Sequence, residues 1–305
     1  VGDMEGKGIE MNINFVPVKT SNVRWDIGAN FSSSYSMITK LADGAKEIAL
    51  LSNSYSGIFA VEGERFPVLK GTTYVRDDQG RVVVDATTGL PQVNSQLQVL
   101  GRTTPKYILG FTTSLKVKGF TLSATADYRT GHKFFSGTKN SLAFSGQLEE
   151  SAAFDRTQPY IIANSVYMQG GSYVANTNVP IYATTYNNQN STSYNPTLAV
   201  SEYYGGAAYN SVGENFVLDA TAFKIREIGL SYTFSKDLLG QSKINELTIG
   251  VQARNPFTKF AKENRNYDDP ETGFEGNGAY SGYISNSAVQ YPNLRTFGGS
   301  VTVTF

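Results

Sequence analysis

The stretch Leu294-Arg-Thr-Phe-Gly-Gly-Ser-Val-Thr-Val-Thr-Phe305 ends the sequence and alternates strictly between two kinds of side chain. Because successive side chains of a β-strand point to opposite faces, it predicts one small polar face and one apolar face. The apolar row consists of Phe297, Gly299, Val301, Val303 and Phe305. A soluble β-sandwich and an outer-membrane barrel both use such strands; in the barrel the apolar row contacts lipid and the polar row lines a wet lumen. A terminal aromatic residue on an amphipathic strand favours the barrel, with Phe297, Val301, Val303 and Phe305 as its membrane-insertion residues.

Composition excludes several classes of function. The chain has 305 residues with 26 Lys and Arg against 26 Asp and Glu, so its zero net charge gives no indication of nucleic-acid binding. With 0 Cys there are no disulfides, thiolate metal sites or Cys nucleophiles. No stretch approaches the ~18 apolar residues of a membrane helix, but a barrel strand is only half apolar and escapes that criterion.

Six further segments show the two-residue period, and we predict them as antiparallel strands: Lys7–Val18, Asn22–Ile38, Lys106–Val117, Phe120–Arg129, Phe223–Phe234 and Leu247–Phe257. The connections alternate in length along the chain. The short ones are predicted periplasmic turns: Pro17–Asn22, Lys118–Gly119 and Ser235–Asn245. The long ones are predicted extracellular loops: Lys40–Thr104, Thr130–Asp219 and Lys259–Tyr291. We assign no regular structure to these loops beyond a hairpin-like turn at Asp77–Gly80.

Local irregularities give three further expectations. Gly119 is expected to supply the positive φ of the Lys118–Gly119 turn. Phe223 breaks the alternation, so we expect a β-bulge between Phe223 and Arg226. Pro256 cannot donate a backbone hydrogen bond, so the strand that contains it is expected to end there.

The count of about seven strands is odd, whereas single-chain bacterial barrels have an even number. An open sheet with a lipid-facing side cannot remain in a membrane. We therefore expect residues 1–305 to be the C-terminal part of one larger barrel domain, with the remaining strands lying upstream or in another chain.

Several short motifs, in this order and spacing, resemble the C-terminal end of SusC/RagA-type TonB-linked outer-membrane transporters. They cover nearly the whole chain: Lys7–Glu10, Trp25–Ile27, Asn30–Ser32, Gly57–Phe59, Asp85–Pro91, Leu100–Tyr107, Lys118–Phe120, Asp127–Gly131, Asp219–Ile228, Leu230–Tyr232, Arg254–Asn255, Asp268–Glu271 and Tyr291–Phe297. The resemblance implies a barrel of about 22 strands with a plugged lumen. It further implies energised uptake of glycan or peptide fragments, a SusD-like surface lipoprotein as a lid, and TonB as the energising partner. The plug domain and the TonB-contacting segment are absent from this sequence.

Residues with catalytic or metal-binding potential have no partners arranged by the sequence. His132 is the only His, and Asp268, Asp269 and Glu271 do not have the spacing of an EF-hand loop. Asn190-Ser191-Thr192 is a formal glycosylation sequon with no meaning in a bacterial setting. We therefore predict no enzyme activity, no cofactor and no metal site.

Two sets of residues are candidates for binding. The first is a Tyr/Asn-rich loop, either a packed solvated loop or a recognition surface for substrate or lid: Tyr182, Tyr186, Asn188, Tyr203, Tyr204 and Tyr209. The second is a polar row that either holds the plug or solvates the lumen: Arg24, Asp26, Asp127, Arg129, Gln252 and Arg254.

Three hypotheses of function remain open from the sequence. The first is a fragment of a nutrient transporter in the outer membrane. The second is a soluble surface adhesin or carbohydrate-binding β-sandwich. The third is an outer-membrane barrel with a scaffold or secretion role.

Overall fold

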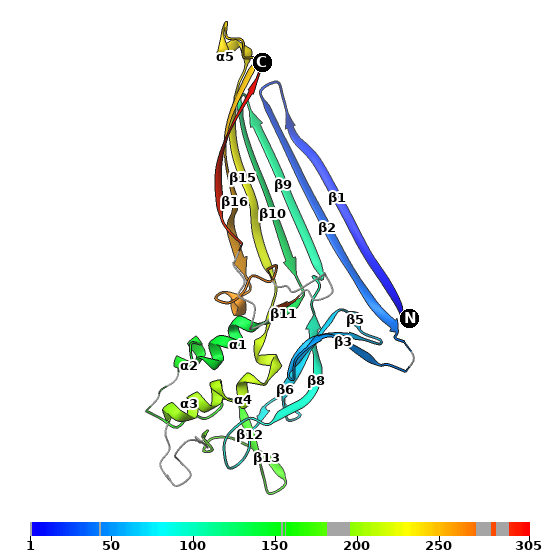
Figure 1. Ribbon diagram of the computed structural model, residues 1–305, viewed down its shortest axis with the longest axis vertical. Coiled ribbons are helices and arrows are strands. Elements are labelled where there is room, and N and C mark those ends of the chain that lie inside the picture. Colours follow the sequence, from blue (N-terminus) through cyan, green and yellow to red (C-terminus); the bar gives the residue numbers. More distant parts are fainter. Residues whose placement is uncertain are drawn as a thin grey trace.

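The computed structural model describes residues 2–42, 44–153, 155, 157–181, 196–272, 282–284 and 293–305. It consists of a long antiparallel sheet and, at one end of that sheet, a loop region of helices and small sheets (Figure 1). One end of the sheet carries the short turns and the C-terminus, and the other end adjoins the loop region.

Seven long strands form the sheet in the order β1-β2-β9-β10-β15-β16-β18, and all neighbours are antiparallel. Their bounds are β1 (Asp3–Lys19), β2 (Val23–Lys40), β9 (Tyr107–Val117), β10 (Phe120–Thr130), β15 (Ala222–Phe234), β16 (Glu246–Phe260) and β18 (Thr296–Thr304). A short strand, β5 (Arg65–Phe66), pairs with β2 beyond the end of β9. The predicted strands and their order are confirmed, and most run further toward the loop region than their alternation indicated. The sheet is open, with β1 and β18 at its edges.

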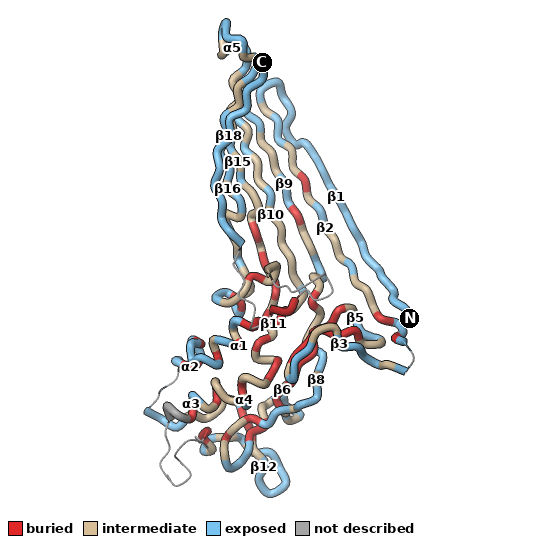
Figure 2. Tube along the Cα trace, viewed as in Figure 1, coloured by how far each residue is buried: buried red, intermediate tan, exposed pale blue. Residues whose placement is uncertain are grey.

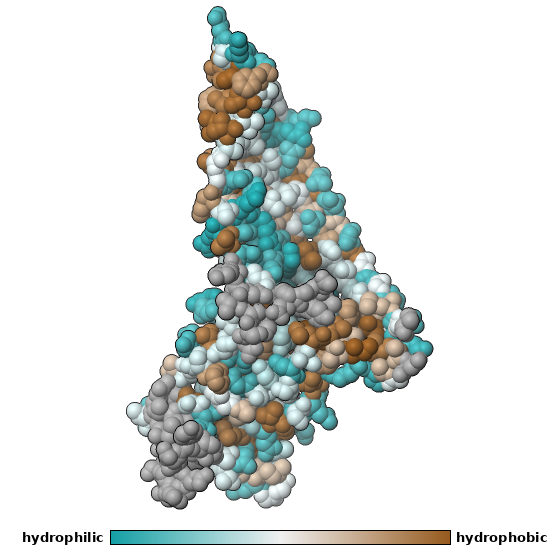
Figure 3. Space-filling view, viewed as in Figure 1, coloured by the Kyte–Doolittle hydropathy of each residue, from teal (hydrophilic) through white to brown (hydrophobic). Residues whose placement is uncertain are grey.

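The two faces of the long sheet differ as predicted. Phe297 and Val301 on β18 are 78% and 68% exposed, and Phe305 directly after it is 80% exposed. No second sheet therefore covers the apolar face in the described part of the chain. The apolar row continues across the sheet, because strand pairing places Val301 opposite Ile249 and Leu230 opposite Val251. Figure 3 shows hydrophilic residues gathered over the half of the sheet that adjoins the loop region. An apolar face without protein cover is the arrangement of a lipid-facing wall.

The hairpin of β9 and β10 shows how the short turns are made. Lys118, not Gly119, takes the positive φ of 51°, so that expectation was wrong. Gly119 is needed for a different reason, because a Cβ there would lie 2.7 Å from the carbonyl oxygen of Thr233. The turn thus needs glycine for the close approach of the neighbouring chain.

The predicted bulge lies at Arg226 on β15. Thr125 of β10 pairs with Glu227 and the next residue, Ala126, pairs with Ile225, which leaves Arg226 as the extra residue. The bulge on the β16 side contains Asn255 and Pro256, and β16 continues to Phe260. The expectation that β16 ends at Pro256 was therefore wrong, because inside a bulge the missing N–H removes no ladder hydrogen bond.

The loop region has its own secondary structure, which was not predicted from the sequence. Three small sheets lie in its described part. The first consists of β3 (Glu47–Ser52), β4 (Ser56–Val61), β6 (Val68–Tyr74) and β8 (Val93–Arg102). The second consists of β14 (Val217–Asp219), β11 (Lys133–Ser136) and β17 (Tyr283–Ile284), and the third of β13 (Ser172–Ala175), β12 (Ser165–Gln169) and β7 (Val82–Val83). The helices there are α1 (Gly137–Phe144), α2 (Glu149–Ala152), α3 (Pro196–Gly205), α4 (Ala207–Asn210), η1 (Gly213–Phe216) and η2 (Lys262–Asn264), while α5 (Lys236–Leu239) lies in a short turn. The Asp77–Gly80 turn is confirmed by the hydrogen bond from Gly80 N to Asp77 O, 2.9 Å. Among the described residues, no helix has both the length and the apolar character needed to cross a membrane.

The hydrophobic core lies in the loop region, and Figure 2 shows buried residues concentrated there while β1 and β18 are exposed. Phe135 and Phe216 are each 1% exposed or less, and Phe135 stacks on Tyr283 with ring centroids 4.7 Å apart. Long connections can be ordered because each contributes apolar side chains to this common core.

Candidate functional site

Charged residues gather on the polar face of the long sheet where it meets the loop region. Of the polar row predicted from the sequence, Asp127 and Arg129 belong to this group. The structure does not bring the other members to it. Arg24 pairs with Asp26 at 2.6 Å on an exposed part of β2, and Arg254 pairs with Glu227 at 3.3 Å. Gln252 lies opposite Gly298 on β18.

Arg226, the bulge residue of β15, connects two elements that are far apart in sequence. Its guanidinium donates to Asp127 on β10, with 3.0 Å between Nη2 and Oδ1 and a second, shorter contact from Nε. It also donates to Glu271 from Nη1 at 2.8 Å and from Nη2 at 2.5 Å. Both contacts are two-pronged, which is the geometry that makes arginine–carboxylate pairs specific. Arg226 therefore fixes residue 271 of the β16–β18 connection to the wall of the sheet.

Lys224 makes a second attachment between the same connection and β15. Its side chain is 2% exposed, and Nζ lies 2.7 and 2.6 Å from the two carboxylate oxygens of Asp269 and 2.8 Å from Glu271 Oε2. Asn293 donates to Asp269 as well, at 3.1 Å. A buried ammonium is tolerated only with such complete pairing.

Three cations and three carboxylates thus share one cluster, which we call the wall–loop ion cluster: Asp127, Arg129, Lys224, Arg226, Asp269 and Glu271. Glu271 is its centre. Burial alone would raise the pKa of the Glu271 carboxyl, but hydrogen bonds from Arg226 and Lys224 outweigh it and lower this pKa to about 2. Glu271 therefore stays ionised well below neutral pH.

The sequence groups Asp268, Asp269 and Glu271 as candidate carboxylates but does not reveal their partners. The structure shows that Asp269 and Glu271 bind the side-chain cations of β15, and that Asp268 accepts hydrogen bonds from Ser136 and from Thr138, the latter at 2.6 Å. Among the described residues, no group of His, Asp and Glu has a metal-binding arrangement. Two sequence features together could have indicated the cluster. They are the Lys-x-Arg pair of β15, at the break in its alternation, and the acidic motif Asp268–Glu271 of the loop that follows β16.

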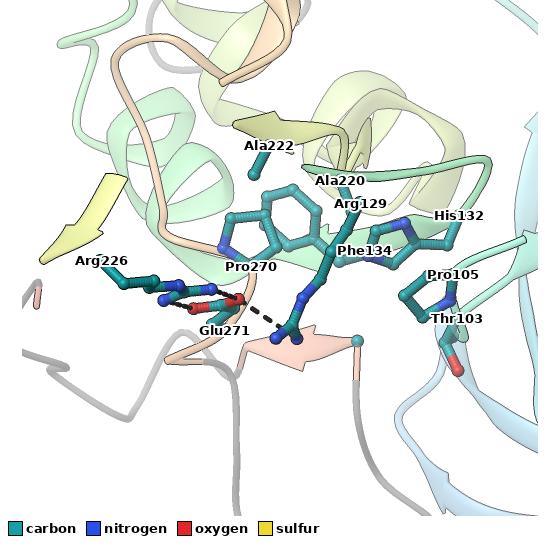
Figure 4. A pocket seen from close by; sticks show the side chains of 11 residues that line it. Thr103, Pro105, Arg129, His132, Phe134, Ala220, Ala222, Arg226, Pro270 and Glu271 are labelled. Carbon is teal, nitrogen blue, oxygen red and sulfur yellow. Dashed lines mark hydrogen bonds and ion pairs between the residues drawn. The ribbon is translucent and has the colours of Figure 1, made fainter. Parts of the chain in front are cut away.

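A pocket of about 330 Å³ adjoins the cluster. Its lining is Thr103, Pro105, Arg129, His132, Phe134, Ala220, Ala222, Arg226, Pro270, Glu271 and Gly282. Figure 4 shows Glu271 between the guanidinium groups of Arg226 and Arg129, with His132, Pro105 and Thr103 on the other side. The pocket therefore has a charged wall on the sheet and a mixed wall from the loop region.

His132 lies in the loop-region wall of this pocket. Burial lowers the pKa of His132 to about 4, so its imidazole is neutral at pH 7. A neutral histidine without a neighbouring nucleophile does not constitute a catalytic arrangement.

The Tyr/Asn-rich candidates divide into two groups. Tyr182, Tyr186 and Asn188 lie outside the described residues, as do the sequon and the first two residues of the Tyr291–Phe297 motif. Tyr203, Tyr204 and Tyr209 are buried and pack on one another, with the centroids of the Tyr203 and Tyr204 rings 4.9 Å apart. These three side chains stabilise the core of the loop region; a contact role for the loop as a whole stays a prediction.

Comparison with known proteins gives one consistent result. No family model matches the chain. Over its full length the chain is 20% identical to TonB-dependent receptor P3 of Formosa agariphila, of which it spans 29%. It also superimposes in full on solved structures of the RagAB peptide transporter, with a TM-score of 0.59, 18% identity and 30% of that chain covered. For the RagAB peptide importer in its open-open state the TM-score is 0.61, with 17% identity and 29% coverage.

The fold and the two-faced sheet define a segment of a transmembrane β-barrel wall with its extracellular loops. The comparisons confirm the predicted resemblance to the C-terminal part of SusC/RagA-type TonB-linked outer-membrane transporters, and with it an outer-membrane location. The chain spans only about 30% of the length of these proteins. The relatives are named as a receptor and as transporters, and none is named as an enzyme.

Proposed function

We propose that this chain forms part of a TonB-dependent importer that takes up peptide or glycan fragments through the bacterial outer membrane. In this proposal a SusD-like surface lipoprotein closes the loop side, and TonB acts through a part of the protein outside these residues. The wall–loop ion cluster holds one extracellular connection against the lumen-facing wall, so that the mouth of the barrel keeps a fixed shape.

The observation that carries the proposal is the combination of an uncovered apolar face with an ordered loop region at one end of the strands. The apolar face requires lipid, and the loop region, with its own core, provides a rigid outer surface. A passive pore needs no such surface, whereas a receptor for large solutes does.

Peptides are the first solute class to test, because the structural neighbours are named as peptide transporters and importers. Tyr and Asn side chains of the loops also suit sugars, by stacking and hydrogen bonding. Glycan fragments are therefore the second class.

Two other functions were considered from the sequence. The soluble sandwich conflicts with Val301 and Phe305, which have no protein cover among the described residues. A scaffold or secretion role is compatible with a barrel wall, and the experiment below separates it from uptake.

The test uses the full-length protein in its own outer membrane. Uptake of fluorescent oligopeptides and of fluorescent oligosaccharides is measured in cells with the gene, without it, and with residues 56–102 replaced by a short Gly/Ser linker. We expect uptake of one solute class that an uncoupler abolishes, that the deletion removes, and that the loop replacement reduces. A surface lipoprotein is expected to co-purify with the intact protein.

Uptake that is unchanged in the deletion strain, or that persists in the presence of the uncoupler, contradicts the proposal. Loss of a surface protein from the deletion strain, with uptake of both solutes intact, would instead establish the scaffold role.

A further inference from the structure

Four buried side-chain atoms have no hydrogen-bond partner in the described part of the chain, and three of them belong to residues that line one pocket. The four atoms are Arg102 Nε, Thr103 Oγ1, Arg129 Nε and His132 Nδ1. Thr103, Arg129 and His132 line the pocket beside the wall–loop ion cluster, and Arg102 precedes Thr103 in the chain. Buried polar groups are nearly always paired, so three unpaired ones around a single cavity indicate a missing partner inside it.

The neighbouring protein acceptors are already occupied. Glu271, the nearest carboxylate in the lining, accepts from Arg226 and Lys224 and pairs with Arg129 through Nη1 at 3.1 Å. Arg129 Nε is 3.4 Å from Asp127 Oδ1, but without the geometry of a hydrogen bond. Arg102 donates from Nη2 to three oxygens, all of them neutral: Ser34 O, Thr104 Oγ1 and Pro105 O.

The unpaired atoms specify the chemistry of the partner. An arginine Nε–H can only donate, a threonine hydroxyl can donate, and the Nδ1 of a neutral histidine donates or accepts according to the tautomer. Arg129 Nε and Thr103 Oγ1 can therefore both donate to an acceptor in the pocket, and a carboxylate supplies two oxygens with about four acceptor sites. Arg102 adds a positive charge, and its hydrogen-bond partners among the described residues are all neutral oxygens.

Size and access also fit a ligand group. The cavity of about 330 Å³ accommodates a carboxylate with the adjoining part of a solute. The Arg129 and Arg226 side chains are 37% and 25% exposed, so the pocket communicates with solvent on the lumen-facing side.

We propose that this pocket binds a carboxylate group of a solute, with Arg129 Nε and Thr103 Oγ1 donating to its oxygens and Arg102 contributing charge. The carboxylate is either the C-terminus of a peptide or the acid group of a uronic sugar. The inference rests on the proposed function only for the source of the solute; binding itself does not require transport.

The test is titration calorimetry of the purified full-length protein in detergent at pH 7, with matched pairs of probes. One pair is acetyl-dialanine and its C-terminal amide; the other is a glucuronic-acid disaccharide and its methyl ester. We expect the acid of one pair to bind at least about tenfold more tightly than its uncharged partner, as for a hydrogen bond to a charged group. The pair that shows the difference identifies the source of the carboxylate.

Variants at one position separate binding from folding. Thr103→Val removes the hydroxyl at constant shape and is expected to weaken binding of the acid about tenfold, while Thr103→Ser retains it. Without ligand, Thr103→Val is expected to melt no lower than the unaltered protein, since the hydroxyl it removes is unpaired. Arg129→Gln is expected to abolish the preference for the acid, and Arg254→Gln, on the same face but outside the pocket, to leave it unchanged.

Equal binding of acid and uncharged probes, no binding of either acid, or an unchanged affinity in Thr103→Val would overturn the proposal and leave ordered water as the occupant. Intact acid binding together with absent uptake in cells would contradict the proposed transport function but not this site.

Discussion

Glu271 is the residue whose removal tests the wall–loop ion cluster most directly. Glu271→Gln keeps the shape of the side chain but removes the charge that Arg226, Lys224 and Arg129 share. A carboxyl whose pKa falls from its ordinary 4.5 to about 2 contributes on the order of 3 kcal/mol when ionised. Because its side chain is 19% exposed, solvent screening reduces this, and we expect a loss of about 2 to 3 kcal/mol.

The loss should appear as detachment of the β16–β18 connection from the wall. Two amides report on it: Asp268 N, which donates to Asn264 Oδ1 at 3.2 Å, and Thr272 N, which donates to Asp269 O at 2.9 Å. Hydrogen exchange followed by mass spectrometry of the full-length protein is the assay. A change of about 2 to 3 kcal/mol predicts exchange about 30- to 150-fold faster over residues 261–272.

Glu227→Gln is the matched control, because Glu227 pairs with Arg254 on the same face while remaining 42% exposed. Such exposed pairs contribute little, so its exchange should stay within about a factor of five of the unaltered protein. If Glu271→Gln exchanges no faster than Glu227→Gln, the cluster does not hold the connection and our account of it is incorrect.

Three further predictions concern acid, lipid and the loop core. The pKa of Glu271 is lowered in the folded protein, so the stabilisation that its carboxylate contributes is fully present above pH 4.5. Protection of residues 261–272 from hydrogen exchange should therefore be constant from pH 7 to 5 and decline toward pH 2. The measurement is the exchange rate corrected for its intrinsic dependence on pH. Val301→Arg on the lipid-facing row should lower folding stability in the membrane by about 2–4 kcal/mol and reduce the heat-modifiable form in outer-membrane fractions. Ser300→Arg on the lumen-facing row should have neither effect, and an equal loss in both variants would contradict the assignment of faces. Phe216→Ala should cost about 3–5 kcal/mol in the loop region and make it sensitive to protease, while heat-modifiability of the barrel persists; loss of both would show that the two parts do not fold separately.

The barrel wall could be predicted from sequence because its determinants are local. Each strand carries its own two-residue period, so one segment such as Thr296–Thr304 reveals both faces without knowledge of its neighbours. The bulge at Arg226 could be predicted as well, because Phe223 does not follow the alternation of the rest of its strand. Pro256 misled the prediction because whether a missing N–H matters depends on the pairing of β16 with its neighbours, which the residue alone does not show.

The loop region and the site could not be predicted in the same way. Its strands are short, from two to ten residues, and its core is assembled from connections separated by more than a hundred positions, such as Phe135 with Tyr283. The ion cluster has the same non-local origin: Lys224 and Arg226 meet Glu271 more than forty positions later. The sequence marks Tyr203 and Tyr209 as part of a Tyr/Asn-rich loop. Whether such residues form a recognition surface or a core depends on whether they are buried, and burial is set by the assembled fold.

The bulge on β15 connects the requirements of the membrane to those of the site. Phe223 and Ile225 are odd-numbered, whereas Ile228 and Leu230 are even-numbered, so in an unbroken strand one of the two pairs would face the lumen. One extra residue at position 226 restores both pairs to the lipid-facing row, as the pairing of Ile225 with Ala126 and of Ile228 with Ala124 shows. The same shift leaves Lys224, Arg226 and Glu227 together on the other side, a density of charge that regular alternation would not allow. Moving the bulge by one residue would therefore expose apolar side chains to the lumen and separate the cations that hold Glu271, so lipid contact and loop attachment depend on one backbone irregularity.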